Sequence, residues 1–290
     1  MTVVIPAFLV ETCRRWPERS AWLDDLPAVI AALRDRWSID LDAPFDGPEV
    51  SASWVAPATR ADGTAAVLKV GMPHMEADHE IAGFRFWDGD PTVRIFEADE
   101  GVGAMLLERC EPGTVLRELP EGDQDVVIAG LLRRLWRPPT PPHPFRPLSA
   151  MMAYWSDETR AAESRWPDLG LVREGLGLFD ELSRPADDDV LLATDLHAGN
   201  VLRARRATWL VIDPKPFVGD RAYDATQHLR NCPERMHRDP RGTIARFADL
   251  LDVDPERVTR WVFARAAAEH RDAWDDWDDD QWALATVLAP

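Results

Sequence analysis

The segment at residues 190–220 constrains the fold of this chain more than any other. It opens with an apolar run at 190–193 that ends in a polar loop. Two further apolar stretches, at 201–202 and 209–212, flank a polar turn at 204–207. Short apolar runs that end at turn residues are typical of buried strands, and the second and third runs are close enough to pair. The segment therefore predicts a strand, a polar loop and a hairpin, in that order.

Three polar residues lie at the ends of these predicted strands. Asp195 and Asn200 fall in the loop, and the hairpin would return the chain so that Asp213 lies beside Asn200. Phosphoryl transfer needs one carboxylate that orients an attacking hydroxyl, and an amide and a second carboxylate that hold Mg²⁺. Short polar residues at strand ends also act simply as caps and turns. We favour the catalytic interpretation, with Asp195 as the general base and Asn200 and Asp213 as metal ligands.

Lysine occupies only two positions, although Lys and Arg together number 33. Lys69 ends an apolar run at 65–68, and Lys215 follows Asp213 by two residues. A compact ammonium on a strand can reach nucleotide phosphates where the larger, planar guanidinium fits poorly. We therefore expect Lys69 to bind the nucleotide.

The residues that precede Lys69 predict a small, β-rich nucleotide-binding lobe. Alternation over 49–57 indicates a strand. Ser51 and Ser53 are small residues where a loop can lie close over phosphates, although no glycine-rich phosphate motif is present.

The helical periodicity of residues 76–87 supplies a partner for Lys69. Glu80, or alternatively Glu76, would form an ion pair with the ammonium and hold it in place. The other interpretation of these carboxylates is a solvated helix face.

An apolar strand is also expected at 102–107, and residues 108–113 break it abruptly. We interpret the break as the hinge of a two-lobed protein. Backbone groups around Glu108 and Cys110 would then meet the adenine edge of the nucleotide.

These motifs resemble those of the aminoglycoside phosphotransferase family, in particular its streptomycin 6-kinase branch, also grouped as aminoglycoside/hydroxyurea resistance kinases. The resembling stretches run in family order from about residue 45 to 235: DGTAAVLKV, LLERCEPGTVL, RLWRPPTPPHPFRPL, DLHAGNVLRA and WLVIDPKPFVGDRAYDATQHLRN. The resemblance implies an α+β, protein-kinase-like bilobal fold. A small N-lobe, 1–109, would bind the nucleotide, and a larger, mostly helical C-lobe, 110–290, would hold the catalytic loop and the acceptor site.

The resemblance also implies an activity and a set of site residues. The family's catalytic Asp falls on Asp195, its metal ligands on Asn200 and Asp213, and its nucleotide Lys on Lys69. The implied reaction is ATP- and Mg²⁺-dependent O-phosphorylation of a small, cationic, streptomycin-like aminoglycoside, which confers antibiotic resistance. A kinase for another sugar or amino sugar, and a degenerate nucleotide-binding homologue, remain as alternatives.

One departure from the family pattern lies next to the catalytic residue. The family usually reads His-Gly-Asp, whereas this chain reads Ala193-Thr194-Asp195. The His braces the loop, and the Gly permits a backbone conformation that a β-branched Thr resists. We expect a working kinase with an altered or slow turnover. Asp220 and Asp224 match family positions, and we expect them to anchor the loop after Asp213 and to start a helix at 223–229.

Bulk properties narrow the partners. The formal net charge of −18 argues against nucleic acids and anionic membranes, and it either attracts a cationic substrate or serves solubility alone. Three scattered cysteines make neither a disulfide framework nor a zinc site. With no leader and no long apolar run, we expect a cytoplasmic, monomeric protein. A further helix is expected at 18–37, interrupted near Pro27.

Overall fold

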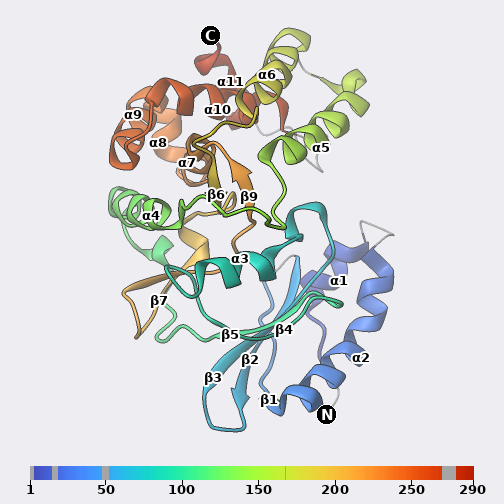
Figure 1. The fold of residues 1–290 in the computed structure, drawn as a ribbon. Coiled ribbons are helices and arrows are strands. Elements are labelled where there is room, and N and C mark those ends of the chain that lie inside the picture. The colour runs from blue at the N-terminus through green and yellow to red at the C-terminus, as the bar shows by residue number, and fades with distance from the viewer. Residues whose placement is uncertain (1–2, 15–18, 48–51, 167, 270–278) are drawn as a thin grey trace. The chain divides into compact units, whose positions relative to one another are not determined.

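The computed structural model describes residues 3–14, 19–47, 52–166, 168–269 and 279–290. The chain divides into two compact units. Unit 1 comprises Met1–Val115 and Leu202–Ile212, and unit 2 comprises Leu116–Val201 and Asp213–Pro290. The larger sheet belongs to unit 1 and most helices belong to unit 2, an α+β composition as expected (Figure 1). The functional assignment of 1–109 and 110–290 as lobes stays a prediction.

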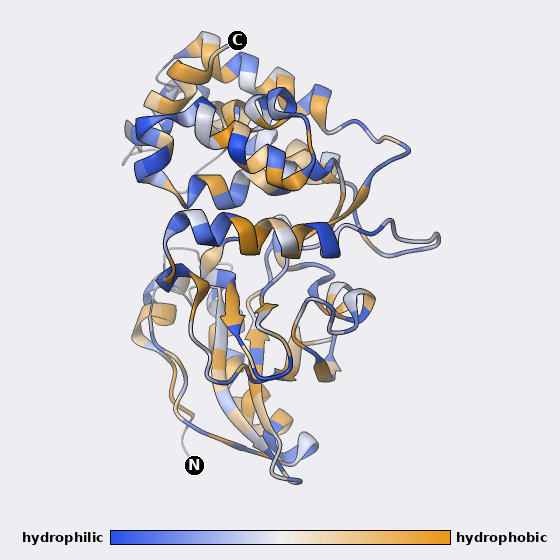
Figure 2. Cartoon of the chain, turned by 90° about the vertical axis from the view of Figure 1, so that its left-hand side faces the viewer, coloured by the Kyte–Doolittle hydropathy of each residue, from blue (hydrophilic) through white to orange (hydrophobic). Residues whose placement is uncertain are grey.

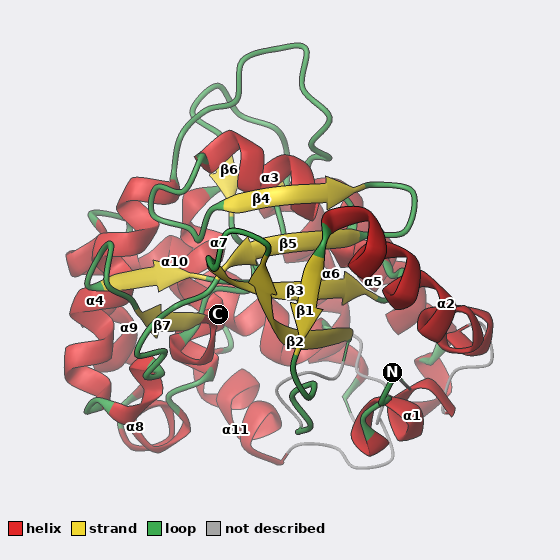
Figure 3. Ribbon diagram, turned by 90° about the horizontal axis from the view of Figure 1, so that it is seen from below, coloured by secondary structure: helices red, strands yellow, loops and turns green. Residues whose placement is uncertain are grey.

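Unit 1 contains a five-stranded antiparallel sheet with the strand order β1-β2-β3-β5-β4 (Figure 3). The elements before Val115 are α1 (Ala7–Arg14), α2 (Ser20–Trp37), β1 (Ile39–Leu41), β2 (Ser53–Arg60), β3 (Ala65–Gly71), the 3₁₀ turn η3 (Met75–Ala77), α3 (Glu80–Trp87), β4 (Ile95–Asp99) and β5 (Ala104–Glu108).

The two faces of this sheet pack against different helices. Leu68 of β3 belongs to a buried cluster with Ile30 of α2, whereas Met105 of β5 packs in a second cluster with Phe84 of α3. Side chains alternate between the faces of a strand. Lys69 therefore points to the face opposite Leu68, toward α3.

The predicted helix at 76–87 is shorter in the structure. A 3₁₀ turn covers Met75–Ala77, and the α-helix begins only at Glu80. His79, the residue before the helix, has φ = +69°, a left-handed conformation that ends the first turn and re-aims the chain. The helical periodicity continued through this break, so the sequence pattern did not reveal it.

The expected interruption of the N-terminal helix at Pro27 is wrong. α2 continues through Pro27 to Trp37. Proline removes one intrahelical hydrogen bond, but Pro27 lies on the exposed side, where water can satisfy the freed carbonyl.

A short hairpin that follows Asn200 belongs largely to unit 1. Its strands, β7 (Val201–Arg203) and β8 (Trp209–Val211), pair as the sequence predicts. Val211 forms a bridge with Thr92, and Arg206 donates to the Thr92 carbonyl at 3.0 Å. Residues more than ninety positions away in the chain therefore hold this hairpin.

Unit 2 is helical apart from a two-stranded sheet of β6 and β9. Its elements are η4 (Leu116–Glu118), α4 (Glu121–Leu135), α5 (Leu148–Ala161), η5 (Glu163–Arg165), α6 (Leu169–Leu182), β6 (Val190–Leu192), η6 (Ala198–Asn200), β9 (Phe217–Gly219), α7 (Arg221–Arg230), α8 (Pro233–Arg238), α9 (Pro240–Leu251), α10 (Pro255–Ala268) and α11 (Asp279–Leu288).

Aromatic side chains join several helices in the core of unit 2. Trp261 of α10 packs edge-on against Tyr223 of α7 at a centroid distance of 5.1 Å, and it also contacts Phe179 of α6. The helices carry both hydrophobic and hydrophilic residues along their length, as amphipathic helices do (Figure 2). Among the described residues, none of the helices combines the length and apolar character that crossing a bilayer requires.

Candidate functional site

In unit 1, Lys69 and Glu80 form a buried ion pair. Lys69 Nζ donates to Glu80 Oε1 at 2.6 Å, and the two side chains are only 7% and 5% exposed. Strand β3 directs the ammonium toward α3, and the late start of α3 places Glu80 in its first turn. The predicted ion pair of Lys69 with Glu80 is confirmed. A buried ammonium that a carboxylate holds in place is a positioned positive charge for an anion.

The other residues expected to bind the nucleotide have varied surroundings. Ser51 lies outside the described residues. Ser53 is buried as the first residue of β2, a strand rather than the expected loop. Burial raises the pKa of the Cys110 thiol to about 12, so this side chain is neutral. Their nucleotide roles stay predictions.

Glu108 is committed to contacts within unit 1. Its carboxylate accepts from Arg206 Nε at 2.9 Å and Nη2 at 2.8 Å. Burial alone would raise its pKa, but hydrogen bonds from Arg206 and from the Arg94 backbone leave that pKa lowered. The Glu108 N–H donates to the Arg94 carbonyl at 2.8 Å. The expected adenine contact would therefore have to come from backbone groups near Glu108 other than its own N–H.

In unit 2, antiparallel pairing of β6 with β9 brings two distant segments together. Leu192 lies opposite Phe217, so the residues that follow β6 lie beside those that precede β9. The N–H groups of Asp195 and Lys215 both donate to the Ala193 carbonyl, at 2.7 and 2.8 Å. The loop that contains Asp195 and the segment that follows Asp213 are thus joined through their backbones.

Thr194 adopts a backbone conformation that glycine enters easily and that a β-branched residue was expected to resist. Its φ is +47°, in the left-handed region that costs a β-branched residue about 1–2 kcal/mol. Its Oγ1 donates to the Lys215 carbonyl at 2.6 Å, a buried hydrogen bond that glycine cannot make. The departure from His-Gly therefore replaces a freely rotating glycine by a residue with its own bond to the neighbouring segment.

Asp224 holds the backbone just before Asp195. Its carboxylate accepts from the N–H groups of Ala193 and Thr194, at 3.0 and 2.8 Å, and from Trp136 Nε1 at 2.9 Å. Burial raises its pKa to about 6, and these three donors oppose that rise. The expectation that Asp224 anchors the loop after Asp213 is corrected, because it anchors the residues that lead into Asp195. Asp220 caps α7 as expected, accepting from the Ala222 N–H at 3.0 Å.

Two side chains of unit 2 contact Asp195, those of Gln227 and Asn200. Gln227 Nε2 donates to its Oδ1 at 2.6 Å. Asn200 Nδ2 donates to the Asp195 carbonyl oxygen at 3.0 Å and lies 3.5 Å from its Oδ2. Because the Asn200 amide nitrogen faces Asp195, its Oδ1 is directed elsewhere, as an amide ligand of a metal requires. The expected placement of Asp213 beside Asn200 stays a prediction.

His197 shapes the turn between Asp195 and Asn200. Its Nδ1 accepts from the Gly199 N–H at 3.0 Å and faces Arg117 Nη2 at 3.1 Å. Burial and the Arg117 charge lower the pKa of His197 to about 4. The imidazole is therefore neutral at physiological pH, and it braces the turn as a hydrogen-bond acceptor.

Asp213 is paired with the second lysine of the chain. Lys215 Nζ donates to Asp213 Oδ1, and the lysine side chain is buried. Asp213 has φ = +57°, so its backbone is turned sharply just after the hairpin. The ammonium places a positive charge directly against the carboxylate expected to bind Mg²⁺.

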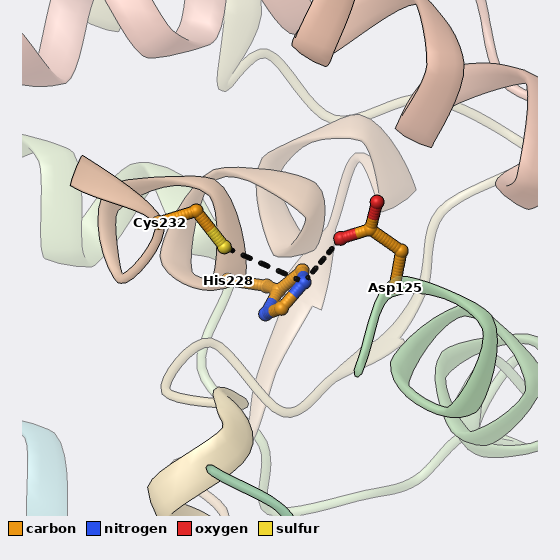
Figure 4. A group of neighbouring side chains, drawn as sticks. All are labelled: Asp125, His228 and Cys232. Atoms are coloured by element: carbon orange, nitrogen blue, oxygen red, sulfur yellow. Dashed lines mark hydrogen bonds and ion pairs between the residues drawn. The ribbon is translucent and has the colours of Figure 1, made fainter. Parts of the chain in front are cut away.

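A further polar cluster lies away from Asp195, where His228 contacts both Asp125 and Cys232 (Figure 4). The three side chains resemble a ligand set for a metal ion. Arg235, however, donates to both carboxylate oxygens of Asp125, at 3.0 and 2.8 Å. Burial raises the pKa of Cys232 to about 12, so its thiol is protonated. We interpret the cluster as an ion-pair brace of α4, α7 and α8.

Sequence reasoning missed Gln227 altogether. A usable signal was present, because Gln227 follows Asp224 by three residues and so shares its face of α7. A helix face that holds the residues before Asp195 is placed to hold Asp195 itself.

Comparisons with known proteins extend over most of the chain. Residues 36–277 match the model of the family described as aminoglycoside/hydroxyurea antibiotic resistance kinase. A streptomycin 6-kinase of Streptomyces griseus is 37% identical over 98% of this chain and 97% of its own length. A hydroxyurea phosphotransferase of Kitasatospora aureofaciens is 34% identical over 91% of this chain and 78% of its own length.

Solved structures share the fold at low sequence identity. A choline kinase from Streptococcus pneumoniae superposes with a TM-score of 0.59 at 12% identity, covering 90% of this chain and 99% of the other. A macrolide 2'-phosphotransferase from Brachybacterium faecium gives a TM-score of 0.57 at 15% identity, covering 92% and 98%. The expected protein-kinase-like fold is confirmed.

Proposed function

Because this chain belongs to the aminoglycoside/hydroxyurea antibiotic resistance kinase family, we propose that it transfers the γ-phosphoryl group of ATP to a hydroxyl of a small, cationic, streptomycin-like aminoglycoside. Such a transfer would confer resistance to the antibiotic. The observation that supports the proposal is the fixed orientation of Asp195. Gln227 donates a hydrogen bond to its carboxylate, and Asn200 donates one to its backbone carbonyl. Asp195 would orient the acceptor hydroxyl and take its proton as the new P–O bond forms.

Lys69 would bind the nucleotide, whereas Asp195 would act on the acceptor hydroxyl. Lys69, held by Glu80, would bind ATP phosphates and offset their charge. Positioning and charge neutralisation contribute most of the rate in phosphoryl transfer, because the transferred group needs little covalent assistance. Backbone groups near Glu108 and Cys110, with Ser51 and Ser53, remain the proposed contacts for the rest of the nucleotide.

The residues proposed for Mg²⁺ fit its chemistry. Mg²⁺ prefers oxygen ligands and retains several waters, so a few protein oxygens are enough. Asp213 offers a carboxylate, and Asn200 offers an amide oxygen whose direction the Asp195 carbonyl fixes. When bound, the ion would neutralise charge on the phosphates. Lys215 also places a positive charge at Asp213.

The acceptor assignment draws on charge and on the relatives. A protein with a net charge of −18 attracts a polycationic substrate. The Streptomyces griseus relative is named for streptomycin, and the Kitasatospora aureofaciens relative for hydroxyurea, which is uncharged. Hydroxyurea is therefore the second candidate acceptor. A monomeric state and a cytoplasmic location belong to the same proposal.

A panel of acceptors tests the proposal. The purified chain is mixed with ATP, Mg²⁺ and, separately, streptomycin, other aminoglycosides, hydroxyurea and amino sugars, and both ADP release and product mass are followed. We expect a phosphate ester of streptomycin. Asp195→Asn is the matched control and should retain ATP binding but lose turnover by about 10²-fold or more. ATP binding without turnover on any acceptor would instead identify a degenerate homologue.

A further inference from the structure

We propose that Gln227 is a positioning residue for Asp195, and that Arg265 fixes the direction in which Gln227 donates. This role presupposes the kinase activity proposed above. The Gln227 side chain lies between a carboxylate and a guanidinium. Its Nε2 donates to Asp195 Oδ1 at 2.6 Å, and its Oε1 accepts from Arg265 Nη2 at 3.0 Å.

The chemistry of the two neighbours permits only one orientation of this amide. Arginine is always protonated and can only donate, so the amide oxygen must face Arg265. An ionised carboxylate can only accept, so the amide nitrogen must face Asp195. A flipped Gln227 would place two donors together at one end and two acceptors at the other. The amide is therefore locked at both ends.

Arg265 is itself held rigidly. Its Nη1 donates to Thr226 Oγ1 at 2.6 Å, and its Nε donates to Glu269 Oε2 at 2.7 Å. The Arg265 side chain is 3% exposed, and its guanidinium carbon lies 5.0 Å from the centroid of the Tyr223 ring. A planar group fixed on several sides has almost no freedom to rotate. Because Arg265 fixes the Gln227 amide, and that amide donates to Asp195, the position of Arg265 determines the orientation of the Asp195 carboxylate.

The consequence concerns the reacting geometry rather than the fold. Proton acceptance requires the carboxylate within hydrogen-bond reach of the acceptor hydroxyl, and small misplacements are costly in rate. Gln227 restricts rotation of the carboxylate and holds its Oδ1 with a donor that carries no charge. A charged donor at that position would compete with the substrate hydroxyl for the carboxylate. A hydrogen-bond acceptor there would repel the carboxylate.

Two substitutions at this position separate positioning from stability. In Gln227→Glu, the new carboxylate still accepts from Arg265, which offsets part of its repulsion of Asp195, so the unfolding temperature should fall less than in Gln227→Met. We expect kcat with streptomycin at pH 8 to fall about 10²-fold, with the KM for ATP within about twofold of wild type. Gln227→Met keeps the side-chain size but loses both bonds. We expect it to lower kcat about 10-fold and to lower the unfolding temperature as well.

Gln124→Met provides the matched control. Gln124 is a buried amide whose nitrogen donates to the backbone carbonyls of Leu119 at 2.7 Å and Arg117 at 3.3 Å rather than to Asp195. It should lower the unfolding temperature as Gln227→Met does and leave kcat unchanged. Wild-type kcat in Gln227→Glu, or equal kcat losses in the two Met variants, would overturn the positioning role while leaving the kinase proposal intact. Absence of turnover by the wild type on every acceptor would overturn both.

Discussion

The hydroxyl of Thr194 donates to the backbone carbonyl of Lys215 at 2.6 Å. This bond joins the residue before the proposed catalytic base to the residue that pairs with the proposed metal ligand. Thr194 makes this bond while its backbone has a positive φ of +47°. A conformation that costs free energy is thus held by a hydrogen bond that stabilises the same loop.

Substitutions of Thr194 should separate these two contributions. Thr194→Val keeps the β-branched shape and the strain but removes the buried bond, so it should lower the free energy of unfolding by about 1–3 kcal/mol. Thr194→Gly loses the same bond but relieves the strain, so its net effect should be near zero, within about 1 kcal/mol. Urea unfolding measures both. Equal stability of the Val variant and the wild type would show that the bond contributes nothing.

Restoring the family's histidine at Ala193 should not stabilise the loop. Ala193 is fully buried, and its backbone already contacts Asp224, Asp195 and Lys215. A larger side chain in a packed interior typically costs about 1–3 kcal/mol. We therefore expect Ala193→His to lower the unfolding midpoint in the same urea experiment, and a rise in that midpoint would contradict the packing argument.

The charge of Lys69 should not be enough for its role. Lys69→Arg keeps the positive charge, but the planar guanidinium is larger than the ammonium and would have to fit a site in which the Lys69 and Glu80 side chains are only 7% and 5% exposed. We expect turnover to fall about 10²-fold, with weaker ATP binding measured by titration calorimetry. The control is Arg85→Lys on the same helix as Glu80, whose exposed pair with Glu100 should tolerate the change. Unchanged ATP affinity in Lys69→Arg would show that a positive charge alone is enough at this position.

The Lys69–Glu80 pair was predictable, and the surroundings of Asp195 were not. Strand alternation and helical periodicity are local, so they placed Lys69, Glu80 and the hairpin correctly. Gln227 lies 32 residues from Asp195, and Arg265 lies 38 residues from Gln227. Contacts over such distances depend on how α7 and α10 pack, which no local pattern specifies. The break before Glu80 was missed for the opposite reason, because the local periodicity continued through it.

The metal ligands should differ in importance. Asp213→Ala removes a charged oxygen ligand together with the Asp213–Lys215 ion pair, so turnover should be lost and Mg²⁺-dependent ATP binding weakened. Asn200→Ala should be milder, because it removes a neutral ligand. ADP release at increasing Mg²⁺ concentrations measures both effects, and Asn200→Ala should recover partly at high Mg²⁺. Near-normal turnover in Asp213→Ala would show that the metal assignment is wrong.

Glu269 should make the stability of the protein sensitive to acid. Its carboxylate accepts from Arg230 at 2.6 Å and from Arg265 at 2.7 Å, and although burial alone would raise its pKa, these two cations lower it to about 2. The folded-state pKa lies below the unfolded value of 4.5, so the stabilisation is complete above pH 4.5 and is lost as the pH falls toward 2.

The difference between wild type and Glu269→Gln should therefore depend on pH. Unfolding free energies should differ by up to roughly 3 kcal/mol near pH 7, and the difference should shrink between pH 4.5 and pH 2. Glu181→Gln is the control, because Glu181 pairs with Arg260 on an exposed surface and salt bridges of that kind contribute little. Denaturant titrations from pH 7 to pH 3 measure both variants. A constant difference across that range would show that the buried charge of Glu269 does not set the acid sensitivity.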